Sequence, residues 1–339
     1  MIDLRSDTVT KPTAEMLAFM FRAEVGDDVF SEDPSIIALE QKTASIFGKE
    51  AGIFCPSGTM TNQIGIKVLS DPPGEIICDE LAHVYQYEGG GISFNSGLSV
   101  KLLQGDRGRL TANLVSEAIN PNDVHKPKTQ IVSVENTCNK GGGSIYPFRD
   151  LKEISELAKN NGLYYHLDGA RIFNALTEAD YTAKQVGSLF DTISVCMSKG
   201  LGCPVGSVLI GSNEHIAKAR RIRKVFGGGM RQAGYLAAAA IYALDHHVNR
   251  LKEDHLRARK ISDILNGLNY VEDIMPVETN IVVFKLTEKL DLNQFLGKLA
   301  EMGIKAVAFG PRLVRFVTHL DFSDDDLNEL EKSLKNFRI

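Results

Sequence analysis

Short apolar segments and helical stretches alternate through most of the chain. Strand-length runs rich in Ile, Val or Tyr occur at 75–80, 130–136, 163–168, 192–198 and 206–211. Helical periodicity separates several of these runs, for example at 149–162. Strands that alternate with helices predict an α/β fold, in which helices cover both faces of a mostly parallel sheet.

Capping residues indicate a helix before the first of these strands. Asp33 is a favoured N-cap residue, Pro34 suits the first helical position, and Gly48 suits the position just after the last turn. Apolar residues recur between them at helical spacing. The sequence therefore predicts a helix that begins at Pro34 and ends before Gly48.

The pattern changes after about residue 245, where long charged helical stretches replace the alternation. The elements expected there are a helix within 247–268, strands at 280–286 and 312–319, and a last helix from Ser323. This order is typical of a small α+β domain. We therefore expect residues 1–245 to form an N-terminal arm and a large α/β domain, and residues 246–339 to form the small C-terminal domain.

Composition and charge exclude several classes of protein. The 339 residues are 43% hydrophobic and 24% charged, with a net charge of −5, which is ordinary for a globular protein. Because no long basic run is present, nucleic acid is not an expected partner. The longest apolar run, 233–244, is shorter than the ~18 residues of a membrane span. The five cysteines are scattered and form no Cys-x-x-Cys pair, which predicts reduced thiols in a cytoplasmic protein and no dedicated metal site.

Chemically useful side chains stand at the ends of the predicted strands. Glu135, Asp168 and Lys199 each end or directly follow one of the apolar runs. In an open parallel sheet, ligands bind beyond the carboxyl ends of the strands. These side chains are therefore expected at one edge of the sheet.

A small-residue turn at 55–63 adds a second kind of feature. It contains Ser57, Gly58 and Thr59 and opens a predicted helix. Free backbone N–H groups at the start of a helix bind anions such as phosphate.

A lysine, a strand-end aspartate and an anion-binding turn together favour pyridoxal phosphate. This cofactor forms a covalent imine with a lysine amine, and it needs a carboxylate beside its pyridine nitrogen. His83, which follows the strand at 75–80, can place a flat ring against the cofactor.

Each of these residues alone has a simpler structural explanation. A lysine after a strand is usually solvated, and an aspartate before glycine often stabilises a turn. A loop histidine often only makes hydrogen bonds with nearby protein groups. Their joint order is what favours a cofactor site. The glycines after Lys199 resemble a dinucleotide loop, but Pro204 intervenes and a strand follows, so a nicotinamide cofactor is not expected.

Several longer motifs resemble the L-type threonine aldolases of the low-specificity and L-allo-threonine group. They run from residue 3 to residue 319 and so cover nearly the whole chain. The matching stretches are DLRSDTVTKPT (3–13), VGDDVFSEDP (25–34), CPSGTMTNQ (55–63), HLDGARIFNA (166–175), SKGLGCPVGS (198–207), GGGMRQAG (227–234) and VRFVTH (314–319). The resemblance implies the pyridoxal phosphate-dependent fold type I, as in aspartate aminotransferase.

The resemblance also implies a role for each matching residue. Lys199 would hold pyridoxal 5′-phosphate covalently, Asp168 would pair with its pyridine nitrogen, and His83 would stack on its ring and take part in catalysis. Further cofactor contacts would come from Ser57, Gly58, Thr59, Arg171 and Arg231, the last across a subunit boundary. The substrate would be bound by Ser6, His125, Arg171 and Arg315.

The implied reaction is the retro-aldol cleavage of L-threonine, L-allo-threonine and related β-hydroxy-α-amino acids. The products are glycine and an aldehyde, which is acetaldehyde for threonine, so the enzyme would serve threonine breakdown and glycine formation. The base that removes the β-hydroxyl proton remains open between His83, His125 and a water held by them. A homotetramer with shared active sites is implied. The alternatives are a β-eliminating lyase or aminotransferase of the same fold, and a cofactor-binding module without catalysis.

Overall fold

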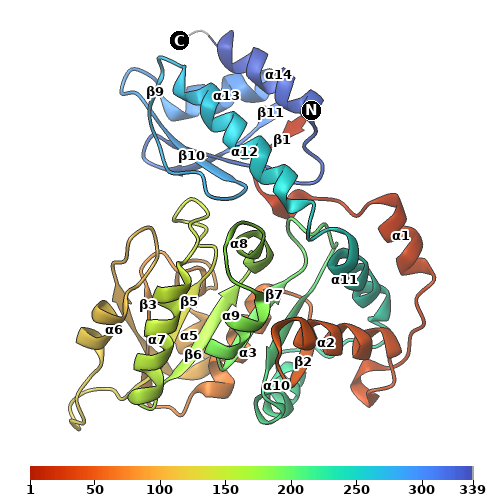
Figure 1. Ribbon diagram of the computed structural model, residues 1–339, viewed down its shortest axis with the longest axis vertical. Helices are drawn as coiled ribbons and strands as arrows, with labels where there is room; N and C mark the ends of the chain where they lie inside the picture. Colours follow the sequence, from red (N-terminus) through yellow and green to blue (C-terminus); the bar gives the residue numbers. More distant parts are fainter. Residues whose placement is uncertain (338–339) are drawn as a thin grey trace.

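Apolar side chains on both faces of consecutive strands build a seven-stranded central sheet (Figure 1). The computed structural model describes residues 1–337. The strand order is β2-β8-β7-β6-β5-β3-β4, and only β8 runs antiparallel to its neighbours. The strands are β2 (Ala51–Cys55), β3 (Gly74–Asp79), β4 (Leu98–Leu103), β5 (Thr129–Glu135), β6 (Tyr164–Gly169), β7 (Thr192–Cys196) and β8 (Ser207–Gly211). The predicted, mostly parallel α/β sheet is confirmed.

Two layers of helices cover this sheet, because neighbouring strand residues point to opposite faces. In β2, Ile53 belongs to one apolar cluster and Phe54 to the other. The first face is covered by α3 (Gly58–Leu69), α4 (His83–Gln86), α5 (Gly91–Ser96) and α10 (Asn213–Val225). The second cluster includes side chains of α1 (Ala14–Phe21), α2 (Pro34–Phe47), α6 (Ala112–Ala118), α7 (Phe148–Asn160), α8 (Ile172–Glu178), α9 (Ala183–Leu189) and α11 (Gly234–His246). No helix among residues 1–337 is long and apolar enough to cross a membrane.

A smaller unit follows α11 and lies above the large sheet in Figure 1. Its antiparallel sheet has the order β12-β13-β10-β9. Its elements are α12 (Leu251–Asn266), β9 (Val271–Ile274), β10 (Ile281–Leu286), α13 (Leu292–Glu301), β11 (Ile304–Lys305), β12 (Val307–Gly310), β13 (Leu313–Val317) and α14 (Asp324–Lys335). The strands expected at 280–286 and 312–319 and the helix after Ser323 are present.

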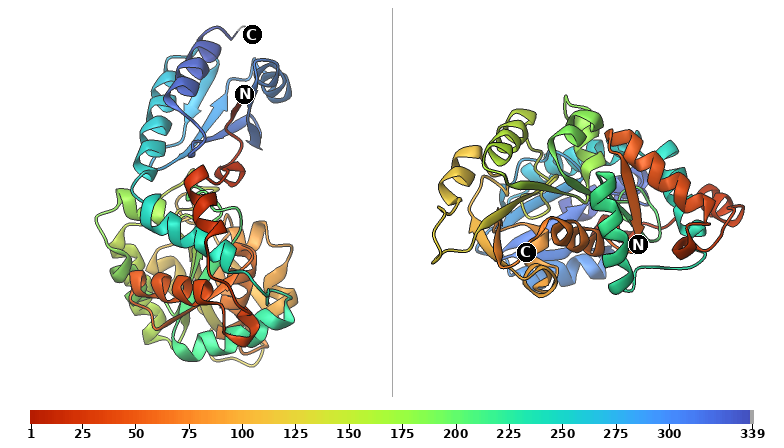
Figure 2. Two further views of the ribbon diagram at one scale, coloured as in Figure 1. Left: turned by 90° about the vertical axis from the view of Figure 1, so that its right-hand side faces the viewer. Right: turned by 90° about the horizontal axis from the view of Figure 1, so that it is seen from below.

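The N-terminal arm connects the two units. Its first strand, β1 (Ile2–Asp3), pairs in parallel with β11, and Ile2 and Leu4 join the apolar cluster of the smaller unit. The first residues of the chain and its last helix, α14, therefore lie in the same unit (Figures 1 and 2). The arm then passes through the short 3-10 helices η1 (Asp7–Val9) and η2 (Asp28–Phe30) and through α1 to reach the large unit. The division into 1–245 and 246–339, which assigned the arm to the large domain, stays a proposal.

Candidate active site

A cavity of about 390 Å³ lies where the large sheet, the N-terminal arm and the smaller unit meet. It brings together five of the predicted cofactor-binding and substrate-binding residues, namely Ser6, His83, Arg171, Lys199 and Arg315. The other lining residues are Thr8, Tyr87, Glu135, Asn139, Lys140, Val307, Ala308 and Phe309. The large unit supplies the lysine and the imidazole, and β12 and β13 of the smaller unit close the other side.

Lys199 reaches this cavity from a tight turn between β7 and β8. The turn closes through a hydrogen bond from the Gly202 backbone N–H to the Lys199 carbonyl, 2.8 Å. Gly206 has a φ of 117°, and a Cβ there would stand 2.4 Å from the Phe54 ring. The small residues after Lys199 are therefore needed because the turn passes close to a packed aromatic ring and uses a left-handed conformation.

Asp168 ends β6 with its side chain almost fully buried. Its Oδ1 accepts a hydrogen bond from the Ala170 backbone N–H at 3.0 Å, and its Oδ2 accepts one from Asn62 Nδ2 at 2.9 Å. Both carboxylate oxygens are thus held in place. Asn62 belongs to α3, so the aspartate is fixed from the same helix that begins with the predicted anion-binding turn.

His83 begins α4, directly beyond β3. Its backbone N–H donates to Glu135 Oε2 at 3.0 Å, and its ring Nδ1 lies 3.0 Å from Glu88 Oε1. Burial alone would lower the pKa of His83, but the hydrogen bond to Glu88 and the nearby carboxylates of Asp168 and Glu135 raise it above its ordinary value.

Two arginines place positive charge in the same cavity as His83. Arg171 donates through Nε and Nη2 to both carboxylate oxygens of Asp7, at 2.8 and 2.7 Å, and its Nη1 has no hydrogen-bond partner among the described residues. Arg315 donates to Asn139 Oδ1 at 2.8 Å and to the Arg5 carbonyl at 2.9 Å. Burial lowers the pKa of Arg315 to about 10, with a further contribution from the neighbouring Arg171 charge.

These contacts leave the arginines able to bind an anion. The Nε atom of Arg315 is buried, and none of residues 1–337 forms a hydrogen bond with it. The Ser6 hydroxyl accepts the Thr8 backbone N–H at 3.2 Å and lines the same cavity, where its own proton is available. Two guanidinium groups and a hydroxyl are the donors expected around a carboxylate.

The predicted anion-binding turn is the N-terminus of α3. Ser57 is the N-cap residue, and its side chain accepts the Met60 backbone N–H at 3.1 Å. The backbone N–H groups of Gly58 and Thr59 have no partner in the helix, as expected for its first residues. Ser207 Oγ is buried and has no hydrogen-bond partner in the part of the chain that the structure describes. It lies 3.6 Å from the place where a Cβ on Gly58 would stand.

Several predicted site residues are not among those that line the cavity: Asp168 and residues 57–59, described above, and also His125 and Arg231. His125 is 87% exposed in the loop that leads into β5, at the opposite end of that strand from Glu135, and it contacts Asp123. Arg231 is 54% exposed and donates to Asp27 Oδ2 at 2.9 Å. Neither residue lines the cavity.

Four buried groups at the site were given no role from the sequence: Asp7, Asn62, Glu88 and Glu135. The first two lie inside the quoted motifs DLRSDTVT and CPSGTMTNQ, which was the available signal. Glu88 lies five residues after His83, and Glu135 ends a predicted strand. Burial is what distinguishes them from ordinary surface acids, and it is visible only in the fold.

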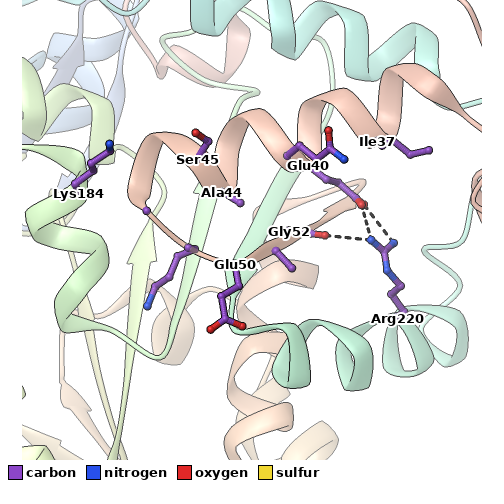
Figure 3. Close-up of a pocket in the computed structure, with 12 residues that line it drawn as sticks. Ile37, Glu40, Ala44, Ser45, Glu50, Gly52, Lys184 and Arg220 are labelled. Carbon is purple, nitrogen blue, oxygen red and sulfur yellow. Dashed lines mark hydrogen bonds and ion pairs between the residues drawn. The ribbon is translucent and has the colours of Figure 1, made fainter.

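A larger cavity, of about 690 Å³, lies between α2, β2 and α10 (Figure 3). Several of its charged side chains are already paired within the protein. Arg220 donates to Glu40 and to the Gly52 carbonyl, and Lys49 donates to the Phe190 carbonyl. Since the described residues that line it include no imidazole and no strand-end carboxylate, this cavity is not the candidate active site.

Comparison with known proteins gives one consistent result. Residues 3–289 match the β-eliminating lyase family. The chain is 40% identical to a probable low-specificity L-threonine aldolase 2 of Arabidopsis thaliana, over 96% of this chain and 94% of that protein. It is 39% identical to a low specificity L-threonine aldolase of Escherichia coli strain K12, over 99% of both chains.

Solved structures agree on the fold. The Leishmania major threonine aldolase superposes with a TM-score of 0.86 and 20% identity, over 99% of both chains. A putative L-allo-threonine aldolase of Listeria monocytogenes gives 0.80 and 21%, over 98% of this chain and 95% of that one. The chain belongs to the β-eliminating lyase family, and its curated relatives of similar length are low-specificity L-threonine aldolases.

Proposed function

We propose that the protein is a pyridoxal phosphate-dependent carbon–carbon lyase that cleaves L-threonine and L-allo-threonine to glycine and acetaldehyde. The observation that carries this proposal is one cavity that joins Lys199, the imidazole of His83 and the two guanidinium groups of Arg171 and Arg315. The names of the curated relatives support the same reaction.

The residues present fit the cofactor. Lys199 offers the amine for covalent attachment, and Asp168 offers a fixed, buried carboxylate for the pyridine nitrogen. The free N–H groups of Gly58 and Thr59, together with the unpartnered Ser207 hydroxyl, are donors for a phosphate. Pyridoxal phosphate, when bound, supplies an electron sink for the pair released as the Cα–Cβ bond breaks.

The chain's own residues orient the substrate and move its proton. Arg171, Arg315 and the Ser6 hydroxyl are placed to bind the carboxylate of the amino acid, which fixes the direction of its Cα–Cβ bond. We assign removal of the β-hydroxyl proton to Nε2 of His83, because that nitrogen has no partner among the described residues and the ring lines the cavity. His125 could take this role only from a neighbouring copy.

Assembly and location belong to the same proposal. We propose a cytoplasmic homotetramer in which Arg231 of one copy acts on the site of another, since it does not reach the cavity of its own chain. The five cysteines are free and buried, which suits a reducing compartment.

The test is a product analysis with purified protein, pyridoxal phosphate and L-threonine. We expect acetaldehyde and glycine in equal amounts. Formation of 2-oxobutanoate and ammonia instead would show that the protein is an eliminating lyase, and amino-group transfer to a 2-oxo acid would show an aminotransferase.

A further inference from the structure

Glu88 is a fully buried carboxylate that the proposed reaction leaves unused. Its side chain has no exposed surface. It accepts hydrogen bonds from Asn62 Nδ2 at 2.8 Å and from Gln63 Nε2 at 2.6 Å, one on each oxygen. Its Oε1 also lies 3.0 Å from Nδ1 of His83. A buried carboxylate that accepts a hydrogen bond on each oxygen is held in one position.

The two amide donors decide how Glu88 meets the imidazole. An amide NH₂ group can only donate, so both oxygens of Glu88 already act as acceptors. The remaining contact is then best made by an N–H of His83, which places the ring proton on Nδ1. Nε2 keeps its lone pair on the side of the ring without a protein partner.

The orientation of Asn62 is fixed by the two carboxylates it meets. Glu88 Oε1 and Asp168 Oδ2 are acceptors, so the Asn62 atom between them must be the NH₂ group. Asn62 Oδ1 then faces His166 Nε2 at 3.3 Å and can accept its N–H. His166 Nδ1 lies 2.8 Å from Thr192 Oγ1, and burial lowers the pKa of His166 to about 4.

The same Asn62 nitrogen connects Glu88, beside His83, with Asp168 at the end of β6. It donates to Glu88 Oε1 and to Asp168 Oδ2, at 2.8 and 2.9 Å. One ligand atom from each of His83, Glu88 and Asp168 lies within 4.8 Å of the others. Hydrogen bonds already satisfy this cluster, so its geometry is explained without a metal ion.

We propose that Glu88 is a positioning residue that holds His83 in the Nδ1–H form, with Nε2 facing the cavity as the proton acceptor for the substrate hydroxyl. In that step the proton leaves the β-oxygen for Nε2, and the O–H electron pair becomes the second bond of the aldehyde carbonyl. The Cα–Cβ pair stays with the carbon that becomes glycine. The use of Nε2 as a base rests on the proposed function, whereas the tautomer assignment does not.

The charges around His83 support this placement. Glu88 and Tyr87 face it from its own segment, Glu135 from β5 and Asp168 from β6. The cationic groups that share the cavity are Lys140, Arg171, Lys199 and Arg315. Of the acids, Glu88 makes the direct ring contact and is the largest influence that raises the pKa of His83.

The direct test is NMR of the histidine ring nitrogens in the cofactor-free protein, with His83 assigned by a His83→Asn variant. We expect the neutral ring of the wild type to carry its proton on Nδ1. Glu88→Gln should lower the pKa of His83 and shift the ring toward the Nε2–H form. Glu80→Gln is the matched control, because Glu80 is a nearby acid whose side chain makes no contact with His83.

Kinetics of the holoenzyme give the second readout. Glu88→Gln should reduce kcat for L-threonine cleavage about tenfold or more while KM changes by less than about threefold. The acid limb of the kcat profile should move to lower pH, because loss of the carboxylate lowers the pKa of the base. Glu80→Gln should leave both unchanged.

The outcomes separate the two proposals. An unchanged tautomer and pKa of His83 in Glu88→Gln would overturn the positioning role. A changed tautomer with normal cleavage would uphold the positioning and overturn the assignment of His83 as base. If Glu88→Gln does not fold, Glu88→Asp keeps the charge but shortens the side chain, and the same ring measurement then decides.

Discussion

At the residue scale, Asp7 is a buried charge that fixes the position of Arg171 in the cavity. It is fully buried, accepts both hydrogen bonds of Arg171 and a third from Asn280 Nδ2 at 3.2 Å. Burial alone would raise the pKa of Asp7, but the Arg171 charge and hydrogen bonds and the nearby Lys199 hold it well below its ordinary value. The carboxylate therefore fixes Arg171 where a substrate carboxylate would bind.

Asp7→Asn should lower the free energy of unfolding by about 3–5 kcal/mol, because it leaves Arg171 buried without a counter-charge. Urea unfolding of the cofactor-free protein measures this change. Asp3→Asn is the matched control, since Asp3 pairs with Arg5 at the surface and should cost less than about 1 kcal/mol. Equal losses for the two variants would contradict a special role for the buried pair.

Glu135 makes stability depend on pH. Burial, with the Asp168 charge beside it, raises its pKa from the ordinary 4.5 to about 7. Between these values the folded protein holds a proton that the unfolded chain has lost, so stability falls as pH rises through this window. Glu135→Gln removes this titration. The variant should therefore gain stability relative to the wild type as pH is raised from about 5 to about 8, measured by chemical unfolding of the cofactor-free protein. A relative loss over that range would show that the carboxyl is stabilised in its charged form.

The residues that the sequence revealed are those whose chemistry is unusual at their position. Charged side chains usually lie in solvent. Lys199 in a glycine-rich turn and Asp168 at a strand end could be singled out because both stand next to buried apolar runs. Glu88 and Glu135 could not, because their roles depend on burial and on partners such as Asn62 that are distant in sequence. Arg171 was expected to face a ligand, and the structure adds that Asp7 already holds two of its nitrogens.

At the scale of elements, Asp33 joins two helices that are far apart in the chain. Its Oδ1 accepts the Ile36 backbone N–H at 3.0 Å as the N-cap of α2, and its Oδ2 accepts the Gly234 backbone N–H at 2.9 Å at the start of α11. Asp33→Ala should lower the free energy of unfolding by about 2–4 kcal/mol, because it removes a cap and leaves a buried N–H unpaired. Thr182→Ala, which removes the exposed N-cap of α9, should cost about 1 kcal/mol. A smaller loss for Asp33→Ala than for this control in thermal or urea unfolding would contradict the double role.

Strand positions followed from the apolar runs, but strand direction did not. The run at 206–211 became β8, which is antiparallel to β7 and β2. The physical reason is the connection: a parallel neighbour needs a crossover of a dozen or more residues, usually with a helix, whereas 197–206 is a loop of ten residues without a helix. The edge strand β4 was missed because its exposed positions break the apolar run.

At the scale of the whole molecule, the proposal that Arg231 serves the site of another copy has a direct consequence. A mixture of Lys199→Ala and Arg231→Ala subunits tests this directly. If the two residues act in one site from different chains, hybrid oligomers contain sites with neither substitution, and cleavage activity should exceed that of either variant alone. Sedimentation of the wild type should show an oligomer of the 37.2 kDa chain. A fully active monomer would refute the shared site.

The cavity between the two units also predicts the stereochemical preference. The amino-acid end of the substrate would meet Ser6 from the arm, Arg171 from the large unit and Arg315 from the smaller unit. This three-sided contact, together with the covalent link at Lys199, places the carboxylate and the scissile bond at once. We therefore expect strict selection of the L-configuration at Cα, and comparable cleavage of D-threonine would contradict the carboxylate contacts.

At Cβ the contacts are few, and we expect weak discrimination with a preference for L-allo-threonine. His83 is the only imidazole among the described residues that line the cavity, and Tyr87 and Phe309 add aromatic rings to its wall. The position of one methyl group in such a pocket changes the transition-state energy by only about 1–3 kcal/mol, so both L-epimers should react. The ratio of kcat/KM for L-allo-threonine and L-threonine, measured by coupled reduction of acetaldehyde, should stay below about 200. Complete rejection of one L-epimer would reveal a specific hydroxyl contact, for which His125 from a neighbouring copy is the first candidate to replace.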